Sequence, residues 1–543
     1  MEVNSLFTFF AALVISMAII PLAIRWAPHL GMLDYPDARK VHTSPIPRAG
    51  GIGIVLGALI PILLWAPSDP AVHAYLFGSL VLLGFGMWDD AKSLGHRIKF
   101  FGQIIAAVAV VYYGDVYIET MPFMDVVQLP DYLAKPFTVF AIIGMINALN
   151  VSDGLDGLAG GLSILSLSCI AYLASQADGD VAIVIVLATL GGALGFLRYN
   201  TYPARVFMGD GGSQFLGFTL GFLAVFLTQK VNTALSPALP LLFLGLPIID
   251  ILAAIAQRLY YNISPFVATK HHIHHRLLEL GFDHYEAVVI IYSVHTLFVV
   301  SAILLSYEQD WLIMSLYLGT CAALLLSLFI AVHKGWRAHQ SRATTRLTKA
   351  INALREHRIF RIAPIGYVKI AIPVFLVVVG LWANKIPSDF GIISIVLLSI
   401  VLWHLLFRAG KDSMVLHTVH YVTAAFVVYL QTINFDAGKP ILDTMEIIYF
   451  VMLAVAVGLV IRYGKENQFR TTPMDYLVIL IVVLTGILLH SVPDVAAIGL
   501  MAVKLIIVFY GCEIIISHSK GRWSTLNISS LLTLSALAVR GML

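Results

Sequence analysis

Charged residues are scarce in this sequence. Of its 543 residues, 12% are charged and 59% are hydrophobic, and the mean hydropathy is +0.88. A soluble domain carries about 25% charged residues, so the surface of this chain cannot face water throughout. The net charge of +3 is too small to indicate a nucleic-acid partner. We therefore expect a membrane protein, with lipid around most of its surface.

Cysteine is scarce as well. Cys169, Cys321 and Cys512 are far apart and each lies in an apolar run. This spacing excludes a disulfide framework and a thiolate metal site, and it favours buried packing. We expect no cleavable signal peptide, because the first apolar run has the length of a full membrane span and lacks a basic start.

Long apolar runs recur along the whole chain. About 20 apolar residues in a helix cross a bilayer, and these runs are continuous, whereas the strands of a membrane barrel would alternate. We predict an all-α polytopic membrane protein with about eleven membrane-spanning helices in a first module and about seven in a C-terminal module. The predicted spans of the first module are residues 5–24, 49–66, 71–88, 100–118, 135–150, 158–176, 180–197, 213–229, 237–259, 286–305 and 312–333. Those of the second are 366–384, 389–407, 413–431, 445–462, 475–491, 496–517 and 525–541.

Basic residues between these spans predict the orientation. If the N-terminus lies outside, only Lys135 and Lys230 fall in outer loops of the first module. The inner loops then hold Arg25, Arg39, Lys40, Arg48, Lys92, Arg97, Lys99, Arg198, Arg205, Arg258, Lys270 and Arg276. Cytoplasmic loops carry an excess of lysine and arginine, so we expect the N-terminus to be outside.

The chain is expected to have three parts. Residues 1–333 form the first membrane module, residues 334–365 a basic cytoplasmic linker, and residues 366–543 a C-terminal membrane module of unassigned role. Part of the linker is either an amphipathic helix on the membrane surface or a solvated segment attracted to anionic lipid.

Aspartates are costly at a membrane boundary, so their positions are informative. They gather at the end of the third span (Asp89-Asp90), after the fifth span (NALNVSDGLDG, 147–157) and before the eighth (FMGDGGS, 207–213). The predicted orientation places all three groups on the inner side. Such carboxylates would repel one another without a cation or protons, and oxygen ligands beside an asparagine suit Mg²⁺ or Mn²⁺. A single Asp-Gly pair commonly makes a turn or caps a helix, but three groups on one face favour a cation site. The glycines around Asp153, Asp156 and Asp210 would let the backbone approach a ligand closely.

Two further inner loops carry candidate binding residues. The segment KHHIHHR (270–276) is too compact for all its histidines to bind one zinc ion, and it favours a cationic, hydrogen-bonding clamp for phosphates over a merely solvated loop. In the loop after the first span, Lys40 and Arg48 either contact a diphosphate or serve only the orientation. Asp250, in the ninth span, either faces a lipid-phosphate groove or hydrogen-bonds a neighbouring helix.

Together these segments resemble the polyprenyl-phosphate N-acetylhexosamine-1-phosphate transferase family (glycosyltransferase family 4). The motifs DD (89–90), NALNVSDGLDGLAGG (147–161), RYNTYPARVFMGDGGS (198–213) and HIHHRL (272–277) occur in the family's order within residues 1 to about 333. The HIHHRLLELGF form resembles the GlcNAc-type transferases. Two features depart from the family: His271 adds a histidine before the motif, and the C-terminal spans lie outside the family core.

The resemblance implies a role for each matching residue. The residues implied in catalysis are Asp89 (a candidate base), Asp90, Asp153 and Asp156 (nucleotide site) and His272. Substrate binding is implied for Lys40, Arg48, Asn147, Lys99, His274 and His275, and Asn150 with Asp210 are implied as ligands of Mg²⁺ or Mn²⁺.

The implied reaction moves a HexNAc-1-phosphate from a UDP-N-acetylhexosamine, by default UDP-GlcNAc, to undecaprenyl phosphate and releases UMP. It would begin a lipid-linked cell-surface glycan, such as O-antigen or a cell-wall polymer, at the cytoplasmic face of a bacterial inner membrane. The alternatives are a phospho-N-acetylmuramoyl-pentapeptide-type transferase and, in a different class, a secondary transporter. An aspartyl intermediate stays open as the rival mechanism, and so does a homodimer as the oligomeric state.

Overall fold

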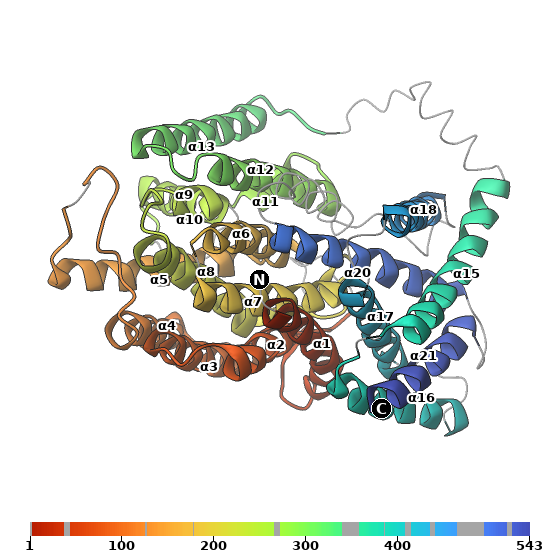
Figure 1. Cartoon of the computed structure of the whole chain (residues 1–543). Coiled ribbons are helices and arrows are strands. Elements are labelled where there is room, and N and C mark those ends of the chain that lie inside the picture. The colour runs from red at the N-terminus through yellow and green to blue at the C-terminus, as the bar shows by residue number, and fades with distance from the viewer. Residues whose placement is uncertain are drawn as a thin grey trace. The chain divides into compact units, whose positions relative to one another are not determined.

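Helices make up almost all of the computed structural model, which describes residues 3–36, 44–124, 127–177, 179–264, 272–338, 358–384, 386–407, 414–434, 440–463, 493–518 and 524–542. In this described part, eleven helices are long and apolar enough to cross a membrane. The prediction of an all-α polytopic membrane protein is therefore confirmed. The chain divides into two compact units, one of residues 1–340 with 472–495 and the other of residues 341–471 with 496–543 (Figure 1).

Every predicted span within residues 1–333 corresponds to helix. In chain order the elements are α1 (Val3–Trp26), α2 (Gly50–Trp65), α3 (Pro70–Lys92), α4 (His96–Val108) with the π-helical η1 (Ala109–Tyr113), α5 (Asp131–Ser152), α6 (Leu158–Ser175), α7 (Asp180–Asn200), α8 (Gly209–Phe226) with the π-helical η2 (Leu227–Val231), α9 (Pro240–Phe243), α10 (Gly245–Tyr260), α11 (Ile273–Glu279), α12 (His284–Leu304) and α13 (Asp310–His333).

Helix α8 lies at the centre of this unit. All its residues from Gly211 to Val225 are buried, and it packs against α2, α3 and α5. Its N-terminus meets α3 where two glycines touch: a Cβ on Gly86 would lie 2.2 Å from the Cα of Gly211. On the α2 side, a Cβ on Gly51 would lie 2.3 Å from the backbone nitrogen of Gly212. Small residues let membrane helices approach closely, so this glycine-rich start is where three helices converge.

The ninth predicted span, residues 237–259, is not one continuous helix. It breaks at Leu244 between α9 and α10. Pro247 has no N–H to give to the carbonyl of Phe243 four residues earlier, and that carbonyl accepts a hydrogen bond from Ser166 Oγ instead (2.6 Å). Tyr317 Oη likewise donates to the carbonyl of Gly245 (3.2 Å). Neighbouring side chains thus satisfy backbone groups at the break.

The loop after α1 is closed at its base by two short strands of two residues each. Strand β1 (Leu33–Asp34) pairs antiparallel with β2 (Ile46–Pro47). The carbonyl of Pro47 then accepts from Phe207 N (2.8 Å), and Gly51 N donates to the carbonyl of Met208 (2.8 Å). These bonds fix the loop beside the start of α8.

The second unit contains α15 (Arg358–Trp382), α16 (Ser388–Phe407), α17 (Met414–Asn434), α18 (Pro440–Tyr463), α20 (Pro493–His518) and α21 (Thr525–Met542). Val401, Leu405, Val419 and Leu534 form a buried cluster among α16, α17 and α21. The buried ring of His420 is held between Ser530 Oγ (2.9 Å) and Asn527 Oδ1 (2.8 Å). The predicted span 475–491 and most of the predicted linker, residues 339–357, lie outside the described residues.

Candidate functional site

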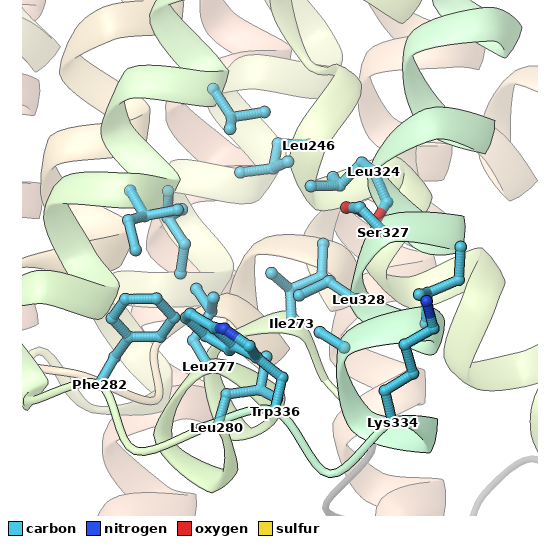
Figure 2. A pocket seen from close by; sticks show the side chains of 15 residues that line it. Leu246, Ile273, Leu277, Leu280, Phe282, Leu324, Ser327, Leu328, Lys334 and Trp336 are labelled. Carbon is cyan, nitrogen blue, oxygen red and sulfur yellow. Dashed lines mark hydrogen bonds between the residues drawn. The ribbon is translucent and has the colours of Figure 1, made fainter. Parts of the chain in front are cut away.

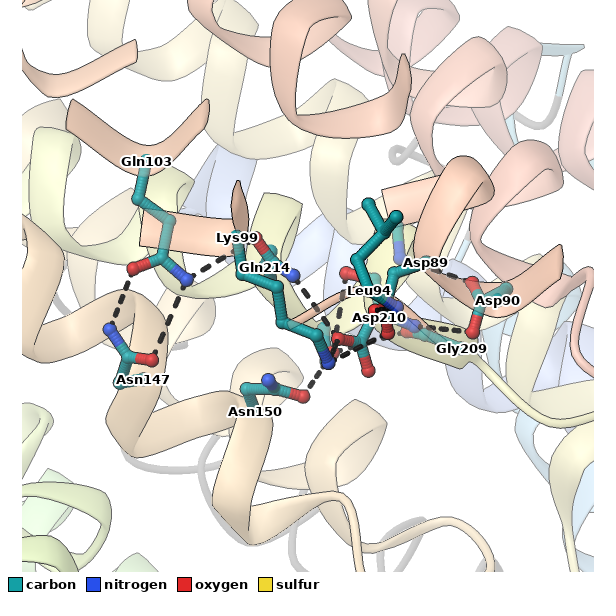
Figure 3. A network of polar contacts seen from close by, with 12 residues as sticks. Asp89, Asp90, Leu94, Lys99, Gln103, Asn147, Asn150, Gly209, Asp210 and Gln214 are labelled. Atoms are coloured by element: carbon teal, nitrogen blue, oxygen red, sulfur yellow. Dashed lines mark hydrogen bonds and ion pairs between the residues drawn. The ribbon is translucent and has the colours of Figure 1, made fainter. Parts of the chain in front are cut away.

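The acidic groups from the ends of α3 and α8 converge on one lysine. Lys99, in the first turn of α4, has its Nζ 2.7 Å from Asp89 Oδ2 and 2.7 Å from Asp210 Oδ2 (Figure 3). The other Asp89 oxygen accepts from Leu94 N (2.6 Å). The Asp89 side chain is 7% exposed, whereas those of Lys99 and Asp210 are 28% and 22% exposed. Two carboxylates therefore share one ammonium at a point that water can reach, which leaves the group with a net negative charge when both are ionised.

Asp90, the next residue in the chain, points away from Lys99 and toward the N-terminus of α8. Its Oδ1 accepts from Asp210 N (3.1 Å) and its Oδ2 from Gly211 N (3.4 Å). These N–H groups belong to the first turn of α8, where no carbonyl within the helix can pair with them. Asp90 thus caps α8 from another helix. Gly209 permits this: its φ is +71°, and a Cβ there would lie 2.5 Å from Asp90 Oδ2.

The predicted diphosphate loop is described only in part. Arg48 forms an ion pair with Asp34 across the β1–β2 hairpin, and its backbone N donates to the carbonyl of Met32 (2.9 Å). Arg48 therefore lies beside the start of α8 with one carboxylate partner already in place. Lys40, the other predicted substrate contact, lies outside the described residues.

The last two turns of α5 bring two asparagines to the site. Asn150 Oδ1 accepts from Ser213 Oγ (2.9 Å), which places Asn150 next to the first turns of α8. Asn147, one turn earlier, donates from Nδ2 to Gln103 Oε1 (2.8 Å) and to the carbonyl of Ile143 (2.8 Å). Asn147, expected to bind substrate, is thus engaged in a layer below the charged groups.

Asp153 and Asp156 lie in the turn between α5 and α6. Burial raises the pKa of Asp153 to about 7, and the negative charges of Asp210 and Asp156 add to this effect. Asp156 Oδ2 accepts from Ala204 N (2.9 Å), which ties this turn to the α7–α8 loop. The two aspartates therefore belong to the same negative site as Asp210.

The histidine segment forms the short helix α11, which the sequence did not predict as helix. Asp250 fixes its start, because Oδ1 accepts from Ile273 N (2.7 Å) and Oδ2 lies 3.0 Å from His272 Nδ1. Of the two roles considered for Asp250, the structure shows the hydrogen bond to a neighbouring helix. His272 is held by this contact and is 5% exposed.

His274 and His275 continue from that anchored start. Their rings are 4.2 Å apart between centroids. A Cβ on Gly154 would lie 2.3 Å from His274 Nε2, so this ring packs directly on the turn that carries Asp153 and Asp156. Burial, with repulsion from His275, lowers the pKa of His274 to about 3. Burial therefore favours the neutral, hydrogen-bonding form of the His274 ring in the free protein, and the cationic phosphate clamp expected from the sequence stays a prediction.

The donor atoms of the site suit a hard divalent cation. Asp89, Asp153, Asp156 and Asp210 contribute carboxylates and Asn150 an amide oxygen, which is the donor type that Mg²⁺ and Mn²⁺ prefer. Within the described residues, no group of three or more His, Cys, Asp or Glu side chains is arranged to hold a metal alone. Mg²⁺ commonly takes one or two protein oxygens and completes its shell with substrate phosphates and water. Asn150 and Asp210 fit a site of that incomplete kind.

An apolar pocket of about 620 Å³ lies on the other side of α11 (Figure 2). Ile273 and Leu277 of α11, with Leu280 directly after the helix, form one wall, and further apolar residues come from α10, α12 and α13. Lys334 is the one charged residue among those that line it. The same short helix thus carries the site histidines and borders an apolar cavity.

Sequence reasoning missed Gln103 and Gln214. Both are 1% exposed, and both lie within predicted spans or at their edge. Each stands four residues after a charged site residue, Lys99 or Asp210. A polar residue at that spacing inside an apolar run was the signal that could have found them.

Comparison with known proteins gives a consistent result. The model of glycosyl transferase family 4 matches residues 72–228. The chain is 36% identical over 307 residues to a "Probable undecaprenyl-phosphate N-acetylglucosaminyl 1-phosphate transferase" of Bacillus subtilis, a match covering 56% of this chain and 86% of the relative. It is 29% identical over 336 residues to an undecaprenyl-phosphate alpha-N-acetylglucosaminyl 1-phosphate transferase of Yersinia pestis (59% and 90%). It is 31% identical over 299 residues to a decaprenyl-phosphate N-acetylglucosaminephosphotransferase of Mycobacterium leprae (49% and 75%).

Proposed function

Because the chain belongs to glycosyl transferase family 4 and is a membrane enzyme that transfers a sugar-1-phosphate to a polyprenyl phosphate, we propose that its donor is a UDP-N-acetylhexosamine and its acceptor undecaprenyl phosphate. UDP-GlcNAc is the first donor to test, since the relatives are named for N-acetylglucosamine. The products are undecaprenyl-diphosphate-HexNAc and UMP. This step would begin a lipid-linked cell-surface glycan, such as O-antigen or a cell-wall polymer.

The observation that carries this proposal is the convergence of Asp89, Lys99 and Asp210 beside Asn150. Phosphoryl transfer depends mainly on positioning and on neutralising charge. In the proposed reaction, an oxygen of the acceptor phosphate bonds to the phosphorus that bears the sugar. The bond from that phosphorus to the bridging oxygen breaks, and UMP departs with the electron pair.

The chain's own residues divide this work. Asp89, beside Lys99, accepts the proton of a singly ionised acceptor phosphate. Lys99 lies where it can neutralise phosphate oxygens, and the neutral ring of His274 donates a hydrogen bond to them. Asn150 and Asp210 would hold a Mg²⁺ ion, which when bound supplies charge neutralisation for the diphosphate. Asp153 and Asp156 line the side of the site that takes the nucleotide.

The pocket beside α11 supports a lipid acceptor. A polyprenyl phosphate has an apolar chain and an anionic head, and α11 offers apolar side chains on one side and histidines on the other. We place the first isoprene units of the acceptor against Ile273, Leu277 and Leu280. Leu277→Gln should raise the KM for undecaprenyl phosphate more than the KM for the nucleotide sugar.

The orientation follows from the basic residues of the loops. Lys99, Arg48 and the histidine helix lie on the side that the distribution of lysine and arginine assigns to the cytoplasm. We therefore place the site at the cytoplasmic face of a bacterial inner membrane, with the N-terminus outside. A cysteine introduced at His96, the first residue of α4, should be labelled by a membrane-impermeant thiol reagent only after the cells are opened.

UMP release from purified protein tests the proposal. UDP-GlcNAc should yield UMP only with undecaprenyl phosphate and Mg²⁺ present, and EDTA should abolish it. UMP from UDP-N-acetylmuramoyl-pentapeptide instead would favour the alternative transferase. A well-folded protein that releases no UMP from any UDP-sugar contradicts the proposal, and solute uptake into vesicles would then test the transporter alternative. Recovery of an aspartate that carries HexNAc-1-phosphate, with release of one equivalent of UMP from donor alone, would favour the covalent mechanism.

A further inference from the structure

Three amide side chains lie beneath the charged site, on three different helices (Figure 3). They are Gln103 on α4, Asn147 on α5 and Gln214 on α8. Each is one helical turn from a site residue of its own helix: the pairs are Lys99 and Gln103, Asp210 and Gln214, and Asn150 and Asn147. Residues three or four apart share a helix face, about 5–6 Å from each other. The amides therefore form a layer one turn below Lys99, Asn150 and Asp210.

Hydrogen bonds connect this layer to the charged site. Asn147 Nδ2 donates to Gln103 Oε1 (2.8 Å), and Gln103 Nε2 donates to Gln214 Oε1 (3.3 Å) and, at a longer distance, back to Asn147 Oδ1 (3.5 Å). Gln214 Nε2 then donates to Asp210 Oδ2 (3.3 Å), the oxygen that also receives Lys99 Nζ. An ionised carboxylate can only accept. The orientation of Gln214, and through it those of Gln103 and Asn147, follows from the charge at the end of the chain.

Burying these amides costs free energy of desolvation, which indicates that their hydrogen bonds do more than pack the helices together. Gln103 and Gln214 are each 1% exposed, and a buried amide is unfavourable unless it is hydrogen-bonded. Apolar side chains would pack α4, α5 and α8 together without that requirement. Hydrogen bonds between amides, unlike apolar contacts, are satisfied in only one axial register of the helices. Such a layer therefore specifies how far each helix projects toward the site.

We propose that this amide layer positions the transferase site: it fixes the register of α4, α5 and α8, and so holds Lys99, Asn150 and Asp210 at the separation that a divalent cation and a diphosphate require. Gln103, Asn147 and Gln214 are then positioning residues, and Gln214 also orients the Asp210 carboxylate directly. The inference rests on the proposed function, which supplies the divalent cation and the diphosphate as ligands. The layer itself is independent of which sugar is transferred.

The test compares Gln103→Met and Gln214→Met with Gln229→Met in the full-length protein. Gln229 is a matched control, because it continues the same helix in η2, is 8% exposed, and accepts from Glu119 N and Thr120 N (3.0 Å each) far from the site. The first readout is the rise in melting temperature with Mn²⁺ alone, without substrate. The second is kcat with its half-activating Mg²⁺ concentration.

Loss of the layer should weaken the cation site by about tenfold and lower kcat by about 10–100-fold, the usual range for residues that support metal ligands. Gln229→Met should lower the melting temperature of the metal-free protein without either change. The double variant Gln103→Met/Gln214→Met should resemble the more severe single variant, because one break already interrupts the chain. If Gln214→Met does not fold, Gln214→Asn, which keeps the amide but shortens it, should shift the Mn²⁺ midpoint in the same direction.

Two results would overturn the inference. One is a Gln103→Met or Gln214→Met protein whose Mn²⁺ midpoint and kcat stay within about twofold of the wild type. The other is a wild-type protein whose melting temperature Mn²⁺ does not move. These results differ from a failure of the proposed function. A wild-type protein that binds Mn²⁺ but turns over no UDP-sugar would refute the reaction, and the Mn²⁺ melting shift would still test the amide layer.

Discussion

Asp89 and Asp90 are neighbours in sequence, yet their carboxylates contact different groups in the structure. Substitutions at the two positions should therefore have different effects on activity and stability. Asp89 faces Lys99 Nζ at 2.7 Å, whereas both oxygens of Asp90 accept from the first turn of α8. We predict that Asp90→Asn keeps most of the activity, that Asp90→Ala loses stability, and that Asp89→Asn loses turnover.

The magnitudes follow from these contacts. Removing a helix cap costs about 0.5–2 kcal/mol of the free energy of unfolding. Asp90 serves two N–H groups, at 3.1 and 3.4 Å, so we expect Asp90→Ala to cost about 2 kcal/mol, the upper end of that range. Asparagine keeps one of the two acceptor oxygens and caps helices about as well as aspartate. Asp90→Asn should therefore lose the longer bond to Gly211 N and retain kcat to within about tenfold, which corresponds to ~1.4 kcal/mol. Loss of a general base lowers kcat by about 10²–10⁴-fold, which is the range expected for Asp89→Asn.

The assay measures UMP release and the melting temperature for each variant in the same detergent. Asp69→Ala is the matched control, because Asp69 caps the other end of α3 by accepting from Ala71 N (2.7 Å). That variant should lose stability and keep kcat. An Asp90→Asn protein that is as inactive as Asp89→Asn while its melting temperature is unchanged would refute the capping role and make Asp90 a direct participant in the reaction.

Three other predictions concern the acidic turn and the second unit. The pKa of Asp153 is raised to about 7 in the folded protein, so the folded state keeps a proton that the unfolded chain releases near pH 4. The free energy of unfolding in EDTA should therefore fall as the pH rises from about 4 to about 7 and then level off. The same pH dependence in Asp153→Asn would show that Asp153 is not the group that titrates. Gly154→Ala would bring a Cβ against His274 and should lower kcat by displacing that ring. Gly144→Ala is the control, because a Cβ there meets open space, and it should keep kcat. Equal kcat values for the two variants would show that the position of the His274 ring does not matter for turnover. A chain truncated after residue 340 should still release UMP if the first membrane module is sufficient, and an inactive but well-folded fragment would show that residues beyond 340, which include 472–495 of the first unit, are needed.

The sequence by itself determined the membrane architecture and the chemistry of the site. Continuous apolar runs of bilayer length permit only helices whose backbone groups pair internally, so the spans could be placed within a few residues. The acidic motifs at the ends of the third, fifth and eighth predicted spans were enough to predict that Asp89, Asp153 and Asp210 share one face. The glycines beside Asp210 were expected to let the backbone approach a ligand, and the structure shows a further use, because Gly211 and Gly212 let α8 pack closely against α3 and α2.

Only the tertiary structure decided how each polar group is used. Asp89 and Asp90 have the same chemistry, and the rotation of α3 against α8 is what sends one carboxylate to Lys99 and the other to a helix N-terminus. Burial against Gly154 removes water from the His274 ring and favours its neutral form, which no spacing of histidines reveals. The amide layer of Gln103, Asn147 and Gln214 likewise exists only once α4, α5 and α8 are in register. Hydropathy and helical period set which residues share a face of one helix, whereas packing between helices sets which of them meet.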